Sequence, residues 1–92
     1  MMELTSKQRK AFEKAAHDLE PVVIIGGNGV TPTLEQKVAE SLKAHELIKV
    51  KFNEFKDDKK ELSLQIAEHT DSTLIRIIGN VAIFYKENEE EK

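Results

Sequence analysis

The stretch PVVIIGGNGVTP, residues 21–32, decides the fold of this chain. Its first part, Val22 to Ile25, is short, β-branched and bounded by a proline and a glycine, which is typical of a strand buried on both faces or nearly so. Thr31 has the residue type of a helix N-cap, and Pro32 suits the first helical position. The stretch therefore predicts a strand, a glycine-rich loop and a helix in direct succession.

Helical patterns lie on both sides of this stretch. Residues 5–8, Thr-Ser-Lys-Gln, have the spacing of a capping box, and they predict a first helix that ends before Pro21. The apolar stripe expected for this helix comprises Ala11, Phe12, Ala15, Ala16 and Leu19. The stripe expected for the helix that begins at Pro32 comprises Leu34, Val38, Leu42 and His45.

A third helix is expected from residue 57 or 58 to about Thr70, because Asp58 and Glu61 have the spacing of a capping box. Its inward-facing residues are expected to be Leu62, Ile66 and Ala67. Leu64 does not fit that stripe, so a strand over residues 62–66 remains an alternative.

The remaining segments have the patterns of strands. Residues 47–52 alternate apolar and basic side chains, which places Ile48, Val50 and Phe52 on one face. Residues 74–78 and 81–86 are separated by Gly79-Asn80, a two-residue spacing typical of a β-hairpin. The whole order is helix, strand, helix, strand, helix, strand, strand. It predicts an α/β fold with a mixed four-stranded sheet packed with helices, parallel at the strand-helix-strand steps and antiparallel at the hairpin.

Length, cysteine content and charge limit the class of protein. The 92 residues suit one domain, expected over residues 1–86, and the lack of cysteine excludes disulfides, thiolate zinc sites and thiol nucleophiles. Residues 87–92 hold four acidic residues and one basic residue and are expected to form a flexible acidic tail, so residues 1–86 carry 13 charges of each sign. No signal peptide or membrane anchor is expected, and the cytoplasm is the expected location.

The glycine loop is the feature with the clearest chemistry. A glycine-rich turn between a strand and a helix places unpaired main-chain N–H groups beside the positive end of a helix dipole. Phosphate is the expected ligand there. The dinucleotide fingerprint fails because Pro32 stands where its third glycine belongs, and the P-loop fails because no Lys-Ser or Lys-Thr pair follows. What remains is G-x-x-G, Gly26 to Gly29, the form with which KH domains clamp single-stranded backbone, with a plain tight turn as the alternative.

Four blocks of the sequence match a known family when they are taken together. They are residues 4–10 (LTSKQRK), 21–31 (PVVIIGGNGVT) and 45–51 (HELIKVK), then Ile78-Gly79 with the final Tyr85. In these blocks, and over residues 3–86 as a whole, the chain resembles the YhbY family, the bacterial single-domain form of the CRM (chloroplast RNA splicing and ribosome maturation) domain. The resemblance implies a fold similar to the C-terminal domain of translation initiation factor three, with a G-x-x-G loop likened to that of KH domains. It also implies RNA binding and association with precursors of the large ribosomal subunit.

The expected RNA contacts combine the loop with basic residues elsewhere. They are Gly26, Gly27, Asn28, Gly29 and Thr31 in the loop and helix start, and the basic residues Lys7, Arg9, Lys10, Lys14, Lys49, Lys51 and Arg76. The cations of the first helix are placed on its exposed side, and those of the strands on the outer face of the sheet. Because neither Gly27 nor Asn28 is basic, Coulomb attraction to phosphate must come from these residues. A solvated helix face and a charged sheet edge would explain the same cations equally well.

No catalytic chemistry is expected from this sequence. His17, His45 and His69 fall at the ends of three helices, where a partly positive imidazole is favoured. No spacing suggests a metal site or a nucleophilic set, so we expect no enzyme activity, no metal and no cofactor. RNA is the expected partner, ribosomal RNA by the resemblance, with no membrane and no small-molecule substrate. Two alternatives stay open, a mononucleotide-binding protein that uses the same loop and a protein-protein interaction domain.

Overall fold

The helices and strands follow the predicted order, and the computed structural model describes residues 4–87. The elements are α1 (Ser6–Ala16), β1 (Val23–Ile25), α2 (Pro32–His45), β2 (Leu47–Phe52), the short 3-10 helix η1 (Lys56–Asp58), α3 (Lys59–Thr70), β3 (Thr73–Ile78) and β4 (Val81–Tyr85). The expected acidic tail over residues 87–92 lies outside the described residues except for Glu87.

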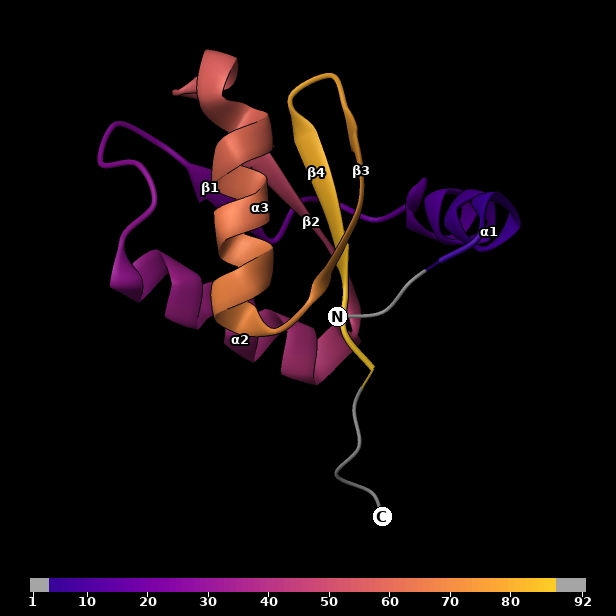
Figure 1. Ribbon diagram of the computed structural model, residues 1–92. Coiled ribbons are helices and arrows are strands. Elements are labelled where there is room, and N and C mark those ends of the chain that lie inside the picture. The colour runs from indigo at the N-terminus through magenta and orange to yellow at the C-terminus, as the bar shows by residue number, and fades with distance from the viewer. Residues whose placement is uncertain (1–3, 88–92) are drawn as a thin grey trace.

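The four strands form one mixed sheet in the order β1-β2-β4-β3. β1 and β2 are parallel and are joined by α2, as the first strand-helix-strand step predicts. β4 pairs antiparallel with both β2 and β3, and Gly79, with a φ of 60°, permits the tight turn between β3 and β4. β2 and β3 therefore run in the same direction without being neighbours, because β4 lies between them (Figure 1).

Helices cover both faces of the sheet, and each face has its own core. α2 and α3 pack on the inner face, where the buried residues are Val23, Ile25, Val38, Leu42, Ile48, Val50, Phe52, Ile66, Ala67, Ala82 and Phe84. α1 lies on the outer face over a smaller cluster of Ala16, Ile75 and Ile83, with Phe12 and Tyr85 packed against it. The alternation predicted for residues 47–52 is confirmed, because Ile48, Val50 and Phe52 are buried in the inner core and Lys51 is exposed on the opposite side.

Helix α1 is shorter than predicted. The capping box at its start is present, since Thr5 Oγ1 accepts from the main-chain N–H of Gln8 at 3.1 Å and the Gln8 side chain accepts from the N–H of Thr5 at 2.9 Å. The helix ends at Ala16, however, and Leu19 lies beyond it with 39% of its surface exposed. The predicted continuation of the helical stripe to Leu19 is therefore wrong.

The face that α1 turns toward the sheet also differs from the prediction. Ala11 and Ala15 are exposed, and the residues that are buried or half-buried are Arg9, Phe12, Glu13 and Ala16. Arg9 and Glu13 make polar contacts with β3, which are described below. An apolar pattern could not reveal a helix face that packs on the sheet through polar groups. This is why the predicted buried face of α1 differs from the observed one.

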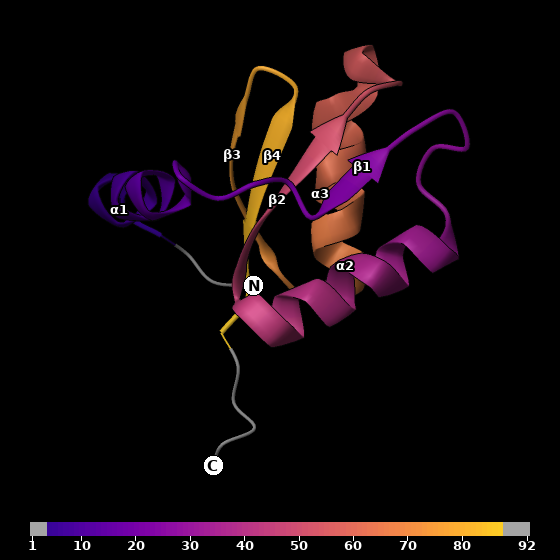
Figure 2. The same ribbon diagram turned by 180° about the vertical axis from the view of Figure 1, so that it is seen from behind.

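The prediction that Val22–Ile25 is buried on both faces is wrong. Val23 and Ile25 are buried, but Ile24 is 55% exposed and Val22 is 38% exposed. α1 contacts β3 and β2 on the outer face, and it leaves the edge strand β1 uncovered there (Figure 2). The outer face of β1 is therefore exposed because α1, the helix on that face of the sheet, lies over β2 and β3.

Helix α3 is confirmed, and the alternative of a strand over residues 62–66 is wrong. Ile66 and Ala67 are buried as predicted, whereas Leu64 faces solvent with 49% of its surface exposed. Asp58 occupies the N-cap position but makes no side-chain capping bond. The capping role that the spacing of Asp58 and Glu61 suggests is therefore not found.

Candidate functional site

The G-x-x-G segment forms a tight bend at the carboxyl end of β1. The main-chain N–H of Gly29 donates to the carbonyl oxygen of Gly26 at 3.0 Å, which closes a four-residue turn. Gly29 has a φ of 70°, a left-handed conformation that favours glycine. Gly27 and Asn28 occupy the centre of the turn and are exposed. The bend therefore presents its two central residues to solvent.

Main-chain donors at the bend remain available to a ligand. Among residues 4–87, nothing accepts a hydrogen bond from the N–H groups of Gly27 and Asn28, whereas the N–H of Gly29 is used inside the turn. α2 begins three residues later, with Thr31 as its N-cap and Pro32 at its first position, as predicted. Thr31 Oγ1 accepts from the N–H of Leu34 at 3.1 Å, so its hydroxyl group is partly committed to the helix. Unused amide protons and the positive end of a helix dipole are thus close together.

The loop after β2 supports the bend and contributes a residue that the sequence analysis missed. The N–H groups of Asn53 and Glu54 both donate to the carbonyl oxygen of Ile25, at 3.0 and 3.2 Å. Phe55 follows directly, and a Cβ atom built on Gly29 would lie 3.3 Å from Cε2 of its ring. The signal that could have found Phe55 is an aromatic residue inside the otherwise hydrophilic run Asn53 to Asp58.

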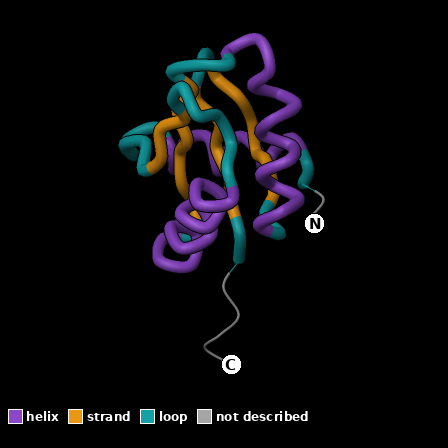
Figure 3. The backbone as a smooth tube through the Cα atoms, turned by 90° about the vertical axis from the view of Figure 1, so that its left-hand side faces the viewer, coloured by secondary structure: helices purple, strands orange, loops and turns teal. Residues whose placement is uncertain are grey.

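The basic residues of α1 lie far from the bend. The loop between β1 and α2 and the helix α1 stand on opposite sides of the molecule in both Figure 1 and Figure 2. In Figure 3, which looks from the side of the bend, this loop passes in front of the strands. Lys7, Lys10 and Lys14 are exposed and share one stripe of the helix, at i, i+3 and i+7. These three lysines therefore form a basic surface that is separate from the bend.

Three of the predicted cations are engaged by the protein itself. Arg9 donates from its guanidinium to the carbonyl oxygens of Leu74 and Ile75, at the irregularity in the register of β3. Lys49 donates to the carbonyl oxygens of His17 and Leu19 at 3.2 and 3.0 Å. Arg76 pairs with Glu13 at 3.2 Å.

Lys51 is the predicted cation that strand pairing connects to the segment just before the bend. It is exposed on β2, opposite Ile24 of β1 in the parallel register, and Ile24 is two residues before Gly26. No hydrogen bond or ion pair involves the side chain of Lys51 within residues 4–87. Its ammonium group is therefore available to a ligand at this end of the sheet.

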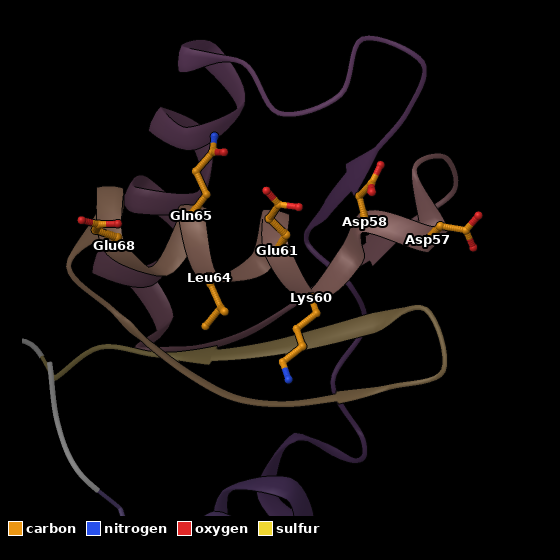
Figure 4. A pocket seen from close by; sticks show the side chains of 7 residues that line it. All are labelled: Asp57, Asp58, Lys60, Glu61, Leu64, Gln65 and Glu68. Carbon is orange, nitrogen blue, oxygen red and sulfur yellow. The ribbon is translucent and has the colours of Figure 1, made fainter.

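An acidic hollow of about 640 Å³ on the exposed side of α3 restricts where an anion can approach. It is lined by Asp57, Asp58, Lys60, Glu61, Leu64, Gln65 and Glu68 (Figure 4). Four of these side chains are carboxylates and one is a cation, so this surface repels a polyanion. The side of β1 and Lys51 carries no such group of carboxylates in the lining of this hollow and is the more favourable side for an anion.

The remaining titratable groups of residues 4–87 include three histidines, each at the end of a different helix. No cluster of His, Asp and Glu in this range could hold a metal ion. His17, His45 and His69 stand at the ends of α1, α2 and α3, as predicted. His69 is in addition 2.8 Å from a carboxylate oxygen of Glu35 and links α3 to α2. Of the helices in the described range, none combines the length and apolar character needed to cross a bilayer.

Known proteins resemble the chain over nearly its whole length. The family model of the CRS1 / YhbY (CRM) domain matches residues 4–86. The chain is 36% identical over 90 residues to "Probable RNA-binding protein YqeI" of Bacillus subtilis, covering 97% of this chain and 94% of the relative. It is also 36% identical over 93 residues to "RNA-binding protein" of Haemophilus influenzae, covering 100% and 94%. The solution structure of SAV1595 from Staphylococcus aureus superposes with a TM-score of 0.80 at 37% identity, over 98% of this chain and 95% of that one.

Proposed function

The chain belongs to the CRS1 / YhbY (CRM) domain family, and from this premise we propose that it binds RNA and holds the phosphate backbone at the bend Gly26–Gly29. The curated relatives that match it over their length are named as RNA-binding proteins. The observation that carries the proposal is that the N–H groups of the exposed residues Gly27 and Asn28 have no acceptor within residues 4–87.

Hydrogen-bond geometry explains why phosphate suits this place. A phosphate oxygen accepts from main-chain N–H groups without needing a side chain, and the N-terminus of α2 adds a favourable dipole. A Cβ atom built on Gly26 or Gly27 meets nothing within 4 Å, so the bend has open space on its outer side. RNA backbone can therefore approach the amide groups closely.

Long-range attraction comes from two separate basic surfaces in this proposal. Lys51 lies on β2 opposite Ile24, two residues before the bend, and Lys7, Lys10 and Lys14 lie on α1 at the other side of the molecule. An RNA that contacts both surfaces must be folded or long enough to pass along the sheet, which favours structured RNA over a single nucleotide. Binding should weaken steeply with salt and depend little on base sequence, because phosphate contacts release counterions and read no bases.

A charge placed on the bend tests this proposal. Gly27→Asp adds a carboxylate where no atom blocks it, and we expect it to reduce affinity for structured ribosomal RNA fragments about tenfold or more through repulsion of phosphate. Gly27→Ala carries the same Cβ without the charge, so the difference in affinity between the two variants measures the effect of the charge alone. Ala39→Glu adds the same charge on the exposed side of α2, away from the bend, and should bind nearly as well as the parent chain.

The outcome is measured by electrophoretic mobility shift at two salt concentrations, with circular dichroism as the test of folding. Unchanged affinity of a folded Gly27→Asp variant would show that the bend does not hold the RNA. Stabilisation of the parent chain by mononucleotides in a thermal-shift assay, without RNA binding, would show that the ligand class is wrong.

We further propose that the RNA is ribosomal and belongs to precursors of the large subunit. The proposal rests on the family and on the requirement for structured RNA. Tagged protein expressed in bacterial cells should co-sediment with large-subunit precursor particles in a sucrose gradient, and Gly27→Asp should leave those fractions. Recovery of both variants only at the top of the gradient would contradict this partner.

A further inference from the structure

Phe55 differs from the other aromatic residues of the chain in being exposed. The sequence contains four Phe and one Tyr and no Trp, and all five of these aromatic residues fall within residues 4–87. Phe52 and Phe84 are fully buried, and the rings of Phe12 and Tyr85 pack against each other at a centroid distance of 4.4 Å. Phe55 alone is exposed, with 43% of its surface open to solvent.

The backbone at Phe55 is held in a conformation that is uncommon for a large side chain. Its φ and ψ are 58° and 37°, in the left-handed region, where a bulky residue persists only if the surrounding structure enforces it. The residues before it are fixed by the two hydrogen bonds to the carbonyl oxygen of Ile25, and the carbonyl oxygen of Phe55 accepts from the N–H of Asp58 at 3.0 Å. These contacts fix the main chain of Phe55 relative to the bend.

The ring of Phe55 lies directly against the bend. A Cβ atom on Gly29 would be 3.3 Å from Cε2 and 3.5 Å from Cζ of the ring, so the absence of a side chain at position 29 makes room for it. Phe55 adds nothing to the inner core, because the buried cluster there does not include it. An apolar ring is thus kept at the surface, next to the amide groups that the proposed function assigns to phosphate.

We infer that Phe55 is a base-stacking subsite, on which one unpaired nucleobase of a single-stranded RNA segment stacks while the adjoining phosphate is held at the bend. This inference rests on the proposed function. Nucleobases that leave an RNA helix stack on aromatic side chains, and every base offers a flat face for this contact. The flanking Lys56 is exposed and places a cation beside the same nucleotide.

Three replacements of Phe55 separate stacking from the shape of the loop. Phe55→Leu keeps an apolar side chain beside Gly29 but has no flat ring, and it should weaken binding of a short unstructured oligoadenylate about 5- to 100-fold. Phe55→Tyr and Phe55→Trp keep the ring and should bind within about twofold of the parent chain, because the stacking face is retained. The slope of affinity against salt should be the same in all four proteins, because stacking releases no counterions.

Phe55→Trp also gives a direct signal, since the chain has no other tryptophan. Stacking of a base on the indole should quench its fluorescence on titration with the oligonucleotide. Abasic nucleotides placed in turn along the oligonucleotide should show one position whose loss weakens binding to the parent chain but not to Phe55→Leu. That coupling between a ring and a base is what a purely structural role would not produce.

The results distinguish this inference from the proposed function. Normal binding by a folded Phe55→Leu variant would overturn the stacking subsite, and so would equal losses in Phe55→Leu and Phe55→Trp, which would indicate a role in loop shape. If Gly27→Asp still weakened binding in either case, the bend would remain the phosphate site. Failure of the parent chain to bind any RNA would overturn the proposed function itself.

Discussion

Lys49 donates a hydrogen bond from Nζ to the main-chain carbonyl oxygen of Leu19 at 3.0 Å and so ties the segment after α1 onto β2. Two residues further along the same face of β2, the side chain of Lys51 has no hydrogen-bond partner within residues 4–87. The two lysines lie on the same face of the same strand, but their side chains differ in what they contact. One contributes to the fold, and the other is available to a ligand.

The first prediction separates these two roles. Lys49→Met should lower the free energy of unfolding by about 1 kcal/mol more than Lys51→Met, because it removes hydrogen bonds that join two segments. Lys51→Met should instead lower RNA affinity and reduce the salt slope by about 0.7 to 0.9, the value for one lost phosphate contact. Urea denaturation and mobility shift on both variants provide the test, and the reverse pattern would contradict the assignment.

The second prediction concerns the basic stripe on α1. Replacing Lys7, Lys10 and Lys14 by Gln should reduce the salt slope by up to about 2.7 units for structured RNA, since each lost phosphate contact contributes about 0.7 to 0.9. Binding of a short single-stranded oligonucleotide, which cannot span the molecule, should be nearly unchanged. Lys60→Gln on α3, which adjoins acidic side chains, serves as a control. Equal losses for both RNAs would indicate that α1 and the bend form one surface.

The third prediction tests the strain at Gly29. Gly29→Ala should lower the free energy of unfolding by about 1 kcal/mol, because the left-handed φ of 70° disfavours any side chain. Gly27→Ala has neither a positive φ nor a neighbour within 4 Å and should be close to neutral. Combining Gly29→Ala with Phe55→Leu in a double-mutant cycle isolates the contact of the new Cβ with the ring. Equal stability of the two single alanine variants would show that the bend is not constrained as described.

The fourth prediction uses the single tyrosine of the chain. Burial, and then the negative charges of Glu46 and Glu87, raise the pKa of Tyr85 above its ordinary value of 10.0. The folded state therefore holds the phenolic proton more tightly than the unfolded state. The free energy of unfolding should be unaffected by this group below pH 10.0 and should fall as the pH rises above that value.

Absorbance titration of the tyrosine in folded and urea-unfolded protein gives the two pKa values directly, because no tryptophan interferes. Tyr85→Phe should remove this part of the alkaline loss of stability while keeping the ring contact with Phe12. A folded-state pKa at or below the unfolded one would contradict the surroundings described for Tyr85.

Local patterns in the sequence were sufficient for the order of the helices and strands and for the position of the bend. Thr5, Thr31 and Pro32 specify helix starts through contacts within a few residues, and the alternation in β2 specifies which side chains are buried. The G-x-x-G segment was found for the same reason, because a positive φ at Gly29 is a local requirement of the chain. These features depend on neighbours along the sequence, so the sequence alone determines them.

The tertiary structure decided how surfaces combine. Only the placement of α1 over β2 and β3 leaves Ile24 exposed and turns Arg9 toward the carbonyl oxygens of Leu74 and Ile75, which are 65 and 66 positions away along the chain. The same holds for Phe55, whose ring meets Gly29 only once the loop after β2 is tied to the end of β1. Burial and charge pairing between distant segments depend on packing geometry, and a periodic pattern does not contain that information.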